Sequence, residues 1–126
     1  MGTKQVAEAT AKVLQSYLTY QAVKTILMEL GETNPPQALW LNQYMATHGI
    51  QDGEAFLEEL LNDNKELVLR ILTVREVLAD TVLDFLPGMV RQSIGHSNTE
   101  HRRHLLERLT RAVPPPESEL PDFPSP

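Results

Sequence analysis

Side chains of the types that can bind zinc lie close together near the C-terminal end of the chain, namely three histidines and one glutamate. They are His96, Glu100, His101 and His104. Histidines three residues apart share a face of a helix, so two of these side chains would point the same way. However, Arg102 and Arg103 lie among them, and their positive charge opposes the binding of a cation. We therefore interpret this stretch as a solvated polar surface and predict no bound metal.

Covalent catalysis has no better support in the sequence. Ser93, His96 and Ser97 are close together, but no orienting carboxylate or oxyanion-hole signal accompanies them. The chain contains no cysteine, which excludes thiol catalysis and disulfides. Its glycines are isolated and form no Gly-rich loop of the kind that binds phosphate. The sequence predicts a protein that is not an enzyme and that needs no cofactor.

Surplus apolar surface on the first helical segment is the strongest indication of function. One stripe, with spacings of three and four residues, consists of Ala7, Ala11, Leu14, Leu18, Ala22, Ile26 and Leu30. A second stripe consists of Val13, Tyr17, Tyr20 and Leu27. A helix needs only one stripe to pack on a single core. The tyrosines therefore either pack inside the core or form a recognition surface, a role suited to rigid side chains with one polar tip. Ile50, an apolar residue expected to be exposed in a connection, favours the recognition surface.

Four helical segments are expected to position these residues. The first should run from about Thr3 to Leu30, with Gly31 as its left-handed C-terminal residue. The second should end at Gly49, and the residues expected to cap the later helices are Asn34, Asp52 and Asn64. The expected inward-facing residues of the second and third helices are Leu39, Trp40, Leu41, Tyr44, Met45, Phe56, Leu57, Leu60 and Leu61.

The fourth segment leaves two alternatives open. Its apolar stripe runs through Leu67, Ile71, Val74, Leu78, Val82 and Phe85. Pro87 and Gly88 follow, a pair that normally stops a helix, yet the apolar pattern resumes after them. The segment is either two helices joined by a polar loop around 95–100 or one helix kinked at Pro87. A single helix over 65–111 would be roughly 70 Å long and would need a second chain to pack against.

Composition limits the class of partner. The chain has 126 residues and a net charge of -6, which argues against nucleic acid. It has no membrane-length apolar run and no secretory signal layout, so we expect a cytoplasmic protein with no membrane partner. One helical domain is expected over 1–112. A disordered tail is expected over 113–126, which holds six of the nine prolines.

Six stretches of the sequence, taken together, resemble the RbcX family of Rubisco assembly chaperones. They are TAKVLQSYLTYQA (10–22), LGETNPPQALWL (30–41), IQDGEAFLEEL (50–60), LRILTVRE (69–76), FLPGMVR (85–91) and NTEHRRHLLERLT (98–110). These stretches cover nearly the whole chain before the tail. The tyrosine doublet, the GETNPP corner and the HRRHLLERLT segment are specific as a set, although none of them would be specific alone.

The resemblance implies an all-α, four-helix bundle-like protomer whose long, kinked last helix pairs in an arc-shaped homodimer. It implies no catalysis and no nucleotide. The dimer would bind the C-terminal peptide of the Rubisco large subunit in a central groove, contact the folded subunit and promote assembly of the octameric core. The resemblance also implies a cytoplasmic, cyanobacterial-type protein and leaves association with the carboxysome open. The residues alone also allow a generic helical adaptor with an unrelated client.

Site residues follow from the resemblance position by position. The groove function is expected at Tyr17, Tyr20 and Ile50. The peripheral polar surface that contacts the folded client is expected at Glu32, Thr33, Asn34, Arg70 and Arg102. Glu29 is a departure, because relatives tend to have glutamine there, and it puts that part of the polar surface in question.

Overall fold

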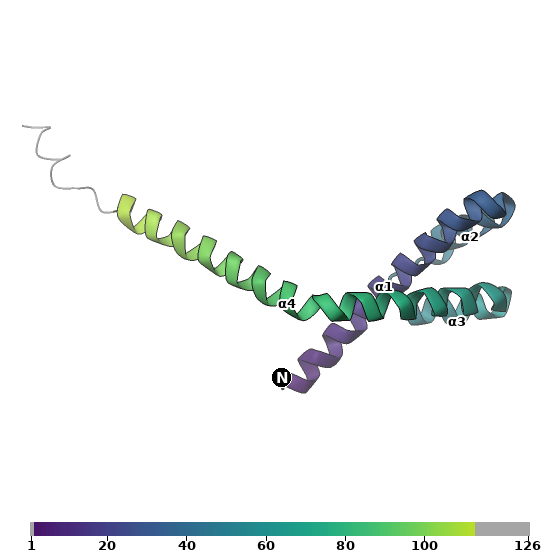
Figure 1. Ribbon diagram of the computed structural model, residues 1–126, viewed down its shortest axis with the longest axis horizontal. Helices are drawn as coiled ribbons and strands as arrows, with labels where there is room; N and C mark the ends of the chain where they lie inside the picture. The colour runs from purple at the N-terminus through teal and green to yellow at the C-terminus, as the bar shows by residue number, and fades with distance from the viewer. Residues whose placement is uncertain (1, 113–126) are drawn as a thin grey trace, which may run out of the picture. The chain divides into compact units, whose positions relative to one another are not determined.

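The structure, a computed structural model, describes residues 2–112, and these are helical apart from short connections. The elements in chain order are α1 (Thr3–Thr33), α2 (Pro35–His48), α3 (Gly53–Asp63) and α4 (Lys65–Ala112), as Figure 1 shows. The all-α class and the long last helix are confirmed. The tail predicted over 113–126 lies outside the described residues.

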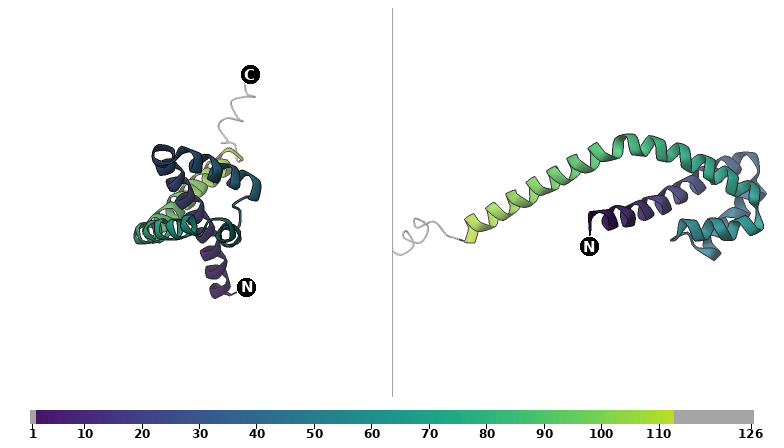
Figure 2. Two further views of the ribbon diagram at one scale, coloured as in Figure 1. Left: turned by 90° about the vertical axis from the view of Figure 1, so that its right-hand side faces the viewer. Right: turned by 90° about the horizontal axis from the view of Figure 1, so that it is seen from below.

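Contacts within the chain divide it into two compact units, the first ending at Asp84 and the second beginning at Phe85. The first unit contains α1, α2, α3 and the beginning of α4. In it, α2 and α3 both pack against α1, which can be followed in both views of Figure 2. The described part of the second unit is the remainder of α4.

The core of the first unit lies along the C-terminal half of α1, where all four helices contribute apolar side chains. These are Ala22, Val23, Ile26, Leu30, Leu41, Tyr44, Phe56, Leu57, Leu60, Leu67, Val68 and Ile71. Burial of a Leu- or Ile-sized side chain stabilises the folded state by roughly 1.5–3 kcal/mol. The first predicted stripe of α1 is therefore confirmed from Leu18 to Leu30, but Ala7 and Ala11 are exposed.

The predicted caps of the last three helices are confirmed. The Asn34 side chain accepts a hydrogen bond from the amide of Gln37 at 3.3 Å. Asp52 accepts from two amides at the start of α3, and Asn64 accepts from the amide of Leu67 at 3.1 Å. Each cap satisfies donors that the first turn of a helix would otherwise leave without partners.

The end of α1 differs from the prediction. The helix continues to Thr33 instead of ending at Leu30, and Gly31 does not adopt a left-handed backbone, whereas Gly49 does, with φ of 76°. The reason is that Asn34 closes α1 as well as opening α2, because its amide donates to the Leu30 carbonyl at 2.7 Å. The last turn therefore needs no glycine.

Three residues predicted to face inward are exposed, and each is a sequence neighbour of a buried one. They are Leu39, Trp40 and Leu61. Successive residues on a helix point about 100° apart, so consecutive apolar residues cannot all face one core. On these short helices Leu41 and Leu60 occupy the inward positions.

Helix α4 is continuous across Pro87, so the alternative with one long helix is confirmed and a loop around 95–100 is wrong. Pro87 has no amide hydrogen, and one hydrogen bond of the helix is lost there. The bend expected at this position stays a prediction. Nearly all side chains over 85–111 are exposed. Among the described helices, none combines the length and apolarity that a bilayer-spanning helix requires.

Candidate functional site

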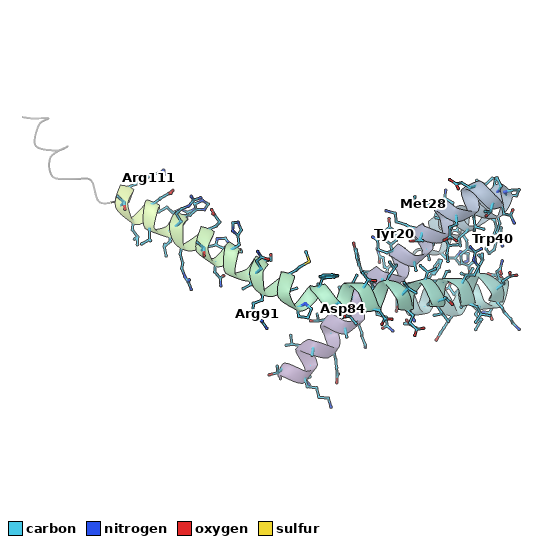
Figure 3. All side chains as sticks on the ribbon, in the orientation of Figure 1. Tyr20, Met28, Trp40, Asp84, Arg91 and Arg111 are labelled. Atoms are coloured by element: carbon cyan, nitrogen blue, oxygen red, sulfur yellow. The ribbon has the colours of Figure 1, made fainter. Side chains whose placement is uncertain are left out.

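An exposed apolar face runs along α1 through Val13, Tyr17 and Tyr20, the last of which is labelled in Figure 3. Their exposed fractions are 72%, 56% and 37%. The ammonium group of Lys24 lies 5.4 Å from the centroid of the Tyr20 ring, a cation–π arrangement. The alternative in which both tyrosines pack inside the core is therefore wrong. Leu27, the last member of the predicted stripe, does pack partly against the core.

Ile50 lies in the connection between α2 and α3. We expected it to be exposed, but it is half-buried and packs against the core, because the connection folds back onto the helices. Next to it is a hollow of about 600 Å³ between α1 and the start of α3. The hollow is lined by Lys12, Val13, Gln15, Ser16, Gln51, Asp52 and Glu54. The lining thus includes residues of the helical turn before Tyr17 and also Gln51, the residue after Ile50.

A second hollow, of about 610 Å³, lies between the N-terminal half of α1 and α4 within the first unit. Its lining is mainly apolar and consists of Ala11, Leu14, Gln15, Leu18, Leu72, Arg75, Glu76, Ala79 and Leu83. Sequence reasoning missed this hollow, although the α1 residues that line it belong to the first predicted stripe. That stripe continues beyond the part of α1 that the core covers, and the uncovered part forms one wall.

Polar contacts join α1, α3 and α4 beside both hollows, and the sequence did not reveal them. The Gly53 amide donates to the hydroxyl of Ser16 at 3.1 Å. Arg75 donates to the hydroxyl of Thr19 at 3.0 Å and forms an ion pair with Glu54. Thr19 is fully buried, and its hydroxyl also donates to a carbonyl one turn back. The only signal in the sequence is that polar Ser16 and Thr19 alternate with apolar residues in mid-helix.

The predicted polar corner lies at the junction of α1 and α2. Glu32, Thr33 and Asn34 are all exposed there. The Thr33 hydroxyl donates to the carbonyl of Glu29 at 2.9 Å, and the Glu29 carboxylate pairs with Arg70 at 2.8 Å. The structure therefore brings Arg70 of α4 to this corner through Glu29.

Arg102 belongs to the second unit and is exposed, as is its neighbour Arg103, which pairs with Glu100 at 2.6 Å. Figure 3 labels Arg91 and Arg111 on the same helix. Large apolar side chains are also exposed on this unit, namely Phe85, Met89, Val90, Ile94, Leu105, Leu106 and Leu109. Within residues 2–112 no three acidic or histidine side chains gather as a metal-binding group.

Tyr44 differs from the other two tyrosines because it is part of the core. Its ring stacks on His48, with centroids 3.8 Å apart, and meets the edge of Phe56. Burial raises the pKa of the Tyr44 hydroxyl to about 12, and the nearby carboxylates of Asp63 and Glu59 act in the same direction. The oxygen has no hydrogen-bond partner among the described residues. This tyrosine stabilises the fold and is not available to a ligand.

Comparison with known proteins assigns a family to this arrangement. The model of the family described as RbcX protein matches residues 1–111. The chain belongs to the RbcX family. The RuBisCO chaperone RbcX of Synechocystis sp. is 69% identical over 125 residues, which cover 99% of this chain and 88% of that protein.

Solved structures of RbcX also match the fold. One crystal structure of RbcX has a TM-score of 0.79 and 60% identity, covering 85% of this chain and 98% of that chain. A crystal structure of RbcX in complex with substrate has a TM-score of 0.80 and 59% identity, covering 87% of this chain and 99% of the solved one. The resemblance inferred from the six sequence stretches is thereby confirmed.

Proposed function

We propose that this chain is a Rubisco assembly chaperone that binds the extended C-terminal segment of the large subunit along its tyrosine face. The observation that carries the proposal is that Tyr17 and Tyr20 are exposed on α1, and that a hollow beside α1 is lined by Ser16 and Gln51, the sequence neighbours of Tyr17 and Ile50. The RbcX relatives named as RuBisCO chaperones and the RbcX structure with bound substrate support it. This role requires binding and release but no catalytic step.

An extended peptide suits this face for physical reasons. The tyrosine rings offer rigid apolar area that loses little conformational entropy on binding, and their hydroxyls can hydrogen-bond a peptide backbone. The hollow beside them could take a side chain of the peptide, and its lining includes Lys12 and Asp52, whose charges could orient it. Because the chaperone must release its client, we expect an affinity near 1 μM, or about -8 kcal/mol.

A homodimer is the second part of the proposal. The apolar side chains exposed over 85–111 and the hollow between α1 and α4 leave more apolar surface than one chain covers. Burial of seven such side chains would contribute on the order of 10 kcal/mol per chain, enough to offset a large part of the cost of association. A two-fold dimer would use the same patch on both copies and supply two tyrosine faces.

The peripheral polar surface, which includes the polar corner and Arg102, is the third part of the proposal. We propose that Glu32, Thr33, Asn34, Arg70 and Arg102 contact the folded large subunit and favour assembly of its octameric core. Four of these residues are exposed and Arg70 is half-buried, which fits a polar contact surface that adds specificity more than affinity. We also propose that the chain acts in the cytoplasm.

The test is the binding of a fluorescently labelled C-terminal peptide of the Rubisco large subunit, followed by anisotropy. Replacing both Tyr17 and Tyr20 by alanine should weaken binding at least about 30-fold, since each buried aromatic is worth roughly 1–2 kcal/mol or more. Phenylalanine at both positions should preserve most of the affinity, because the ring area remains. Met28→Ala, which removes a side chain 77% exposed on the same helix, is the control and should change nothing.

Retained solution mass and helical content must accompany the loss of binding in the double alanine variant. Unchanged peptide affinity in that folded variant would refute the assignment of the groove. Equal loss in the double phenylalanine variant would shift the source of affinity from the rings to the hydroxyl groups.

A further inference from the structure

The joint between α1 and α3 lies on the side of α1 next to the tyrosine face. Its two α1 residues, Ser16 and Thr19, immediately precede Tyr17 and Tyr20 in the sequence. On the α3 side, Gly53 follows Ile50 by three residues. Whatever holds α3 against α1 at this joint therefore also sets the position of Ile50 relative to the tyrosines.

The fit at the joint is close on the α1 side. A Cβ atom on Gly53 would lie 2.8 Å from the Thr19 hydroxyl oxygen and 3.1 Å from the Ser16 Cα. Contacts shorter than 3 Å between carbon and a buried side chain force the surrounding atoms to move. Glycine at this position allows the first turn of α3 to touch α1 backbone to backbone.

Arg75 holds the same joint from α4. Its side chain is only 19% exposed, and one guanidinium nitrogen contacts both the Thr19 hydroxyl and the Glu54 carboxylate. Glu54 is the residue after Gly53, so the ion pair links the first turn of α3 to α4. Because Thr19 is fully buried, loss of the arginine would leave a polar group of the core with one partner fewer.

We propose that Arg75 is a positioning residue for the peptide groove: together with Thr19, Gly53 and Glu54 it fixes the α2–α3 connection so that Ile50 faces the client peptide at the correct distance from Tyr17 and Tyr20. The inference rests on the proposed function, since it assigns a task to residues next to the proposed groove. The residue acts through Ile50 and makes no contact with the peptide itself.

A double-mutant cycle with the labelled peptide separates this role from direct contact and from general loss of stability. Arg75→Met should weaken peptide binding about tenfold, and Ile50→Ala should also weaken it. If the arginine acts through Ile50, adding Arg75→Met to the Ile50→Ala chain should have little further effect. Glu54→Gln, a milder change at an exposed carboxylate, should weaken binding in the same direction and serves if Arg75→Met does not fold.

Glu58→Gln is the matched control, because Glu58 lies one turn further along α3, is exposed and forms no ion pair within the described residues. It should leave the peptide affinity unchanged. Hydrogen exchange gives a readout without peptide: the Gly53 amide, which donates to Ser16, should exchange faster in Arg75→Met and in Glu54→Gln but not in Glu58→Gln.

The outcomes are distinct. An unchanged affinity in folded Arg75→Met and Glu54→Gln, or an effect of Arg75→Met that is as large without Ile50 as with it, would overturn the positioning role and leave the proposed function intact. Failure of the unmodified chain to bind the peptide would instead overturn the proposed function, and the assignment of Arg75 with it.

Discussion

The two halves of α4 show how the same helix can be stabilised in opposite ways. Before Asp84, the helix presents Leu67, Val68 and Ile71 to a core shared with three other helices. From Phe85 to Arg111, the same type of apolar residue recurs, yet nearly every side chain is exposed. The first half is therefore stabilised by the core of its own chain. The apolar side chains of the second half need cover from outside the described residues.

Helix energetics supports this conclusion. An isolated helix of fewer than three or four turns is marginal in water, and longer ones depend on packing for most of their stability. The second half of α4 also contains Pro87 and two glycines, residues that disfavour a helix interior. Tertiary burial must supply what the intrinsic propensities lack, and a second copy of the chain is the proposed source.

The difference between the two halves of α4 is tested most sharply by replacing one isoleucine in each half with alanine. Ile71→Ala should lower the free energy of unfolding by about 2–5 kcal/mol, because Ile71 is fully buried in the core. Ile94→Ala removes a side chain that is 56% exposed within one chain. It should leave the first unit intact but raise the concentration at which the dimer dissociates.

Chemical denaturation checks the first result and sedimentation at several concentrations checks the second. If Ile94→Ala cost as much as Ile71→Ala at a concentration where the chain is monomeric, the two halves would not differ in the way described.

Tyr44 offers a smaller effect that is confined to the first unit. Tyr44→Phe removes a buried hydroxyl without a partner, so stability at pH 7 should stay the same or rise by up to about 1 kcal/mol. The folded-state pKa of about 12 is above the unfolded value near 10. Below about pH 10 the hydroxyl is neutral in both states and stability does not depend on its ionisation; as the pH rises from 10 towards 12 the unfolded state ionises first, so stability is lost.

Thermal melts of both proteins between pH 8 and pH 12 test this sign. The unmodified chain should lose stability relative to Tyr44→Phe above pH 10. Parallel curves over that whole interval would show that Tyr44 ionises equally readily in both states.

The smallest effects are expected at the surface ion pairs of the two units. Glu29→Gln breaks the pair with Arg70, which links two helices, and Glu100→Gln breaks the pair with Arg103 on one helix. Each substitution should cost less than about 1 kcal/mol, and less at high salt, because exposed pairs are screened. Glu29→Gln should have the larger effect on octamer assembly, since it frees Arg70 at the polar corner.

Urea titrations at low and high salt measure the two costs, and assembly of large subunits measures the functional difference. A loss above 2 kcal/mol at either pair would contradict their assignment as solvated contacts.

Much of the fold could be predicted from the sequence because its signals are local. Asn34, Asp52 and Asn64 act as caps within three residues of their partners, and the stripe of α1 reports its own buried face. The end of α1 could not be located correctly. Gly31 can adopt either a helical or a left-handed backbone, and the helix continues past it because Asn34 closes the last turn. Trp40 and Leu61 were wrongly predicted to face inward, because each is next to another apolar residue and only the packing of the helices decides which of the two faces the core.

The candidate site divides in the same way. The surplus stripe predicts exposed tyrosines at Tyr17 and Tyr20, and they are exposed. The contact between Arg75 and Thr19 joins residues 56 positions apart. No local pattern marks such a pair, because it exists only after α1, α3 and α4 have packed. The partial burial of Ile50 was not predicted for the same reason. It depends on the position of the α2–α3 connection, which is held by contacts between residues far apart in the sequence.

The mass of the chain in solution tests most directly the claim that a second copy covers the exposed half of α4. Light scattering at micromolar concentration should give the mass of two chains of 14.2 kDa each, with full helical content. A particle of 14.2 kDa that remains fully helical over 85–111 and exposes no apolar surface to a dye would contradict the account.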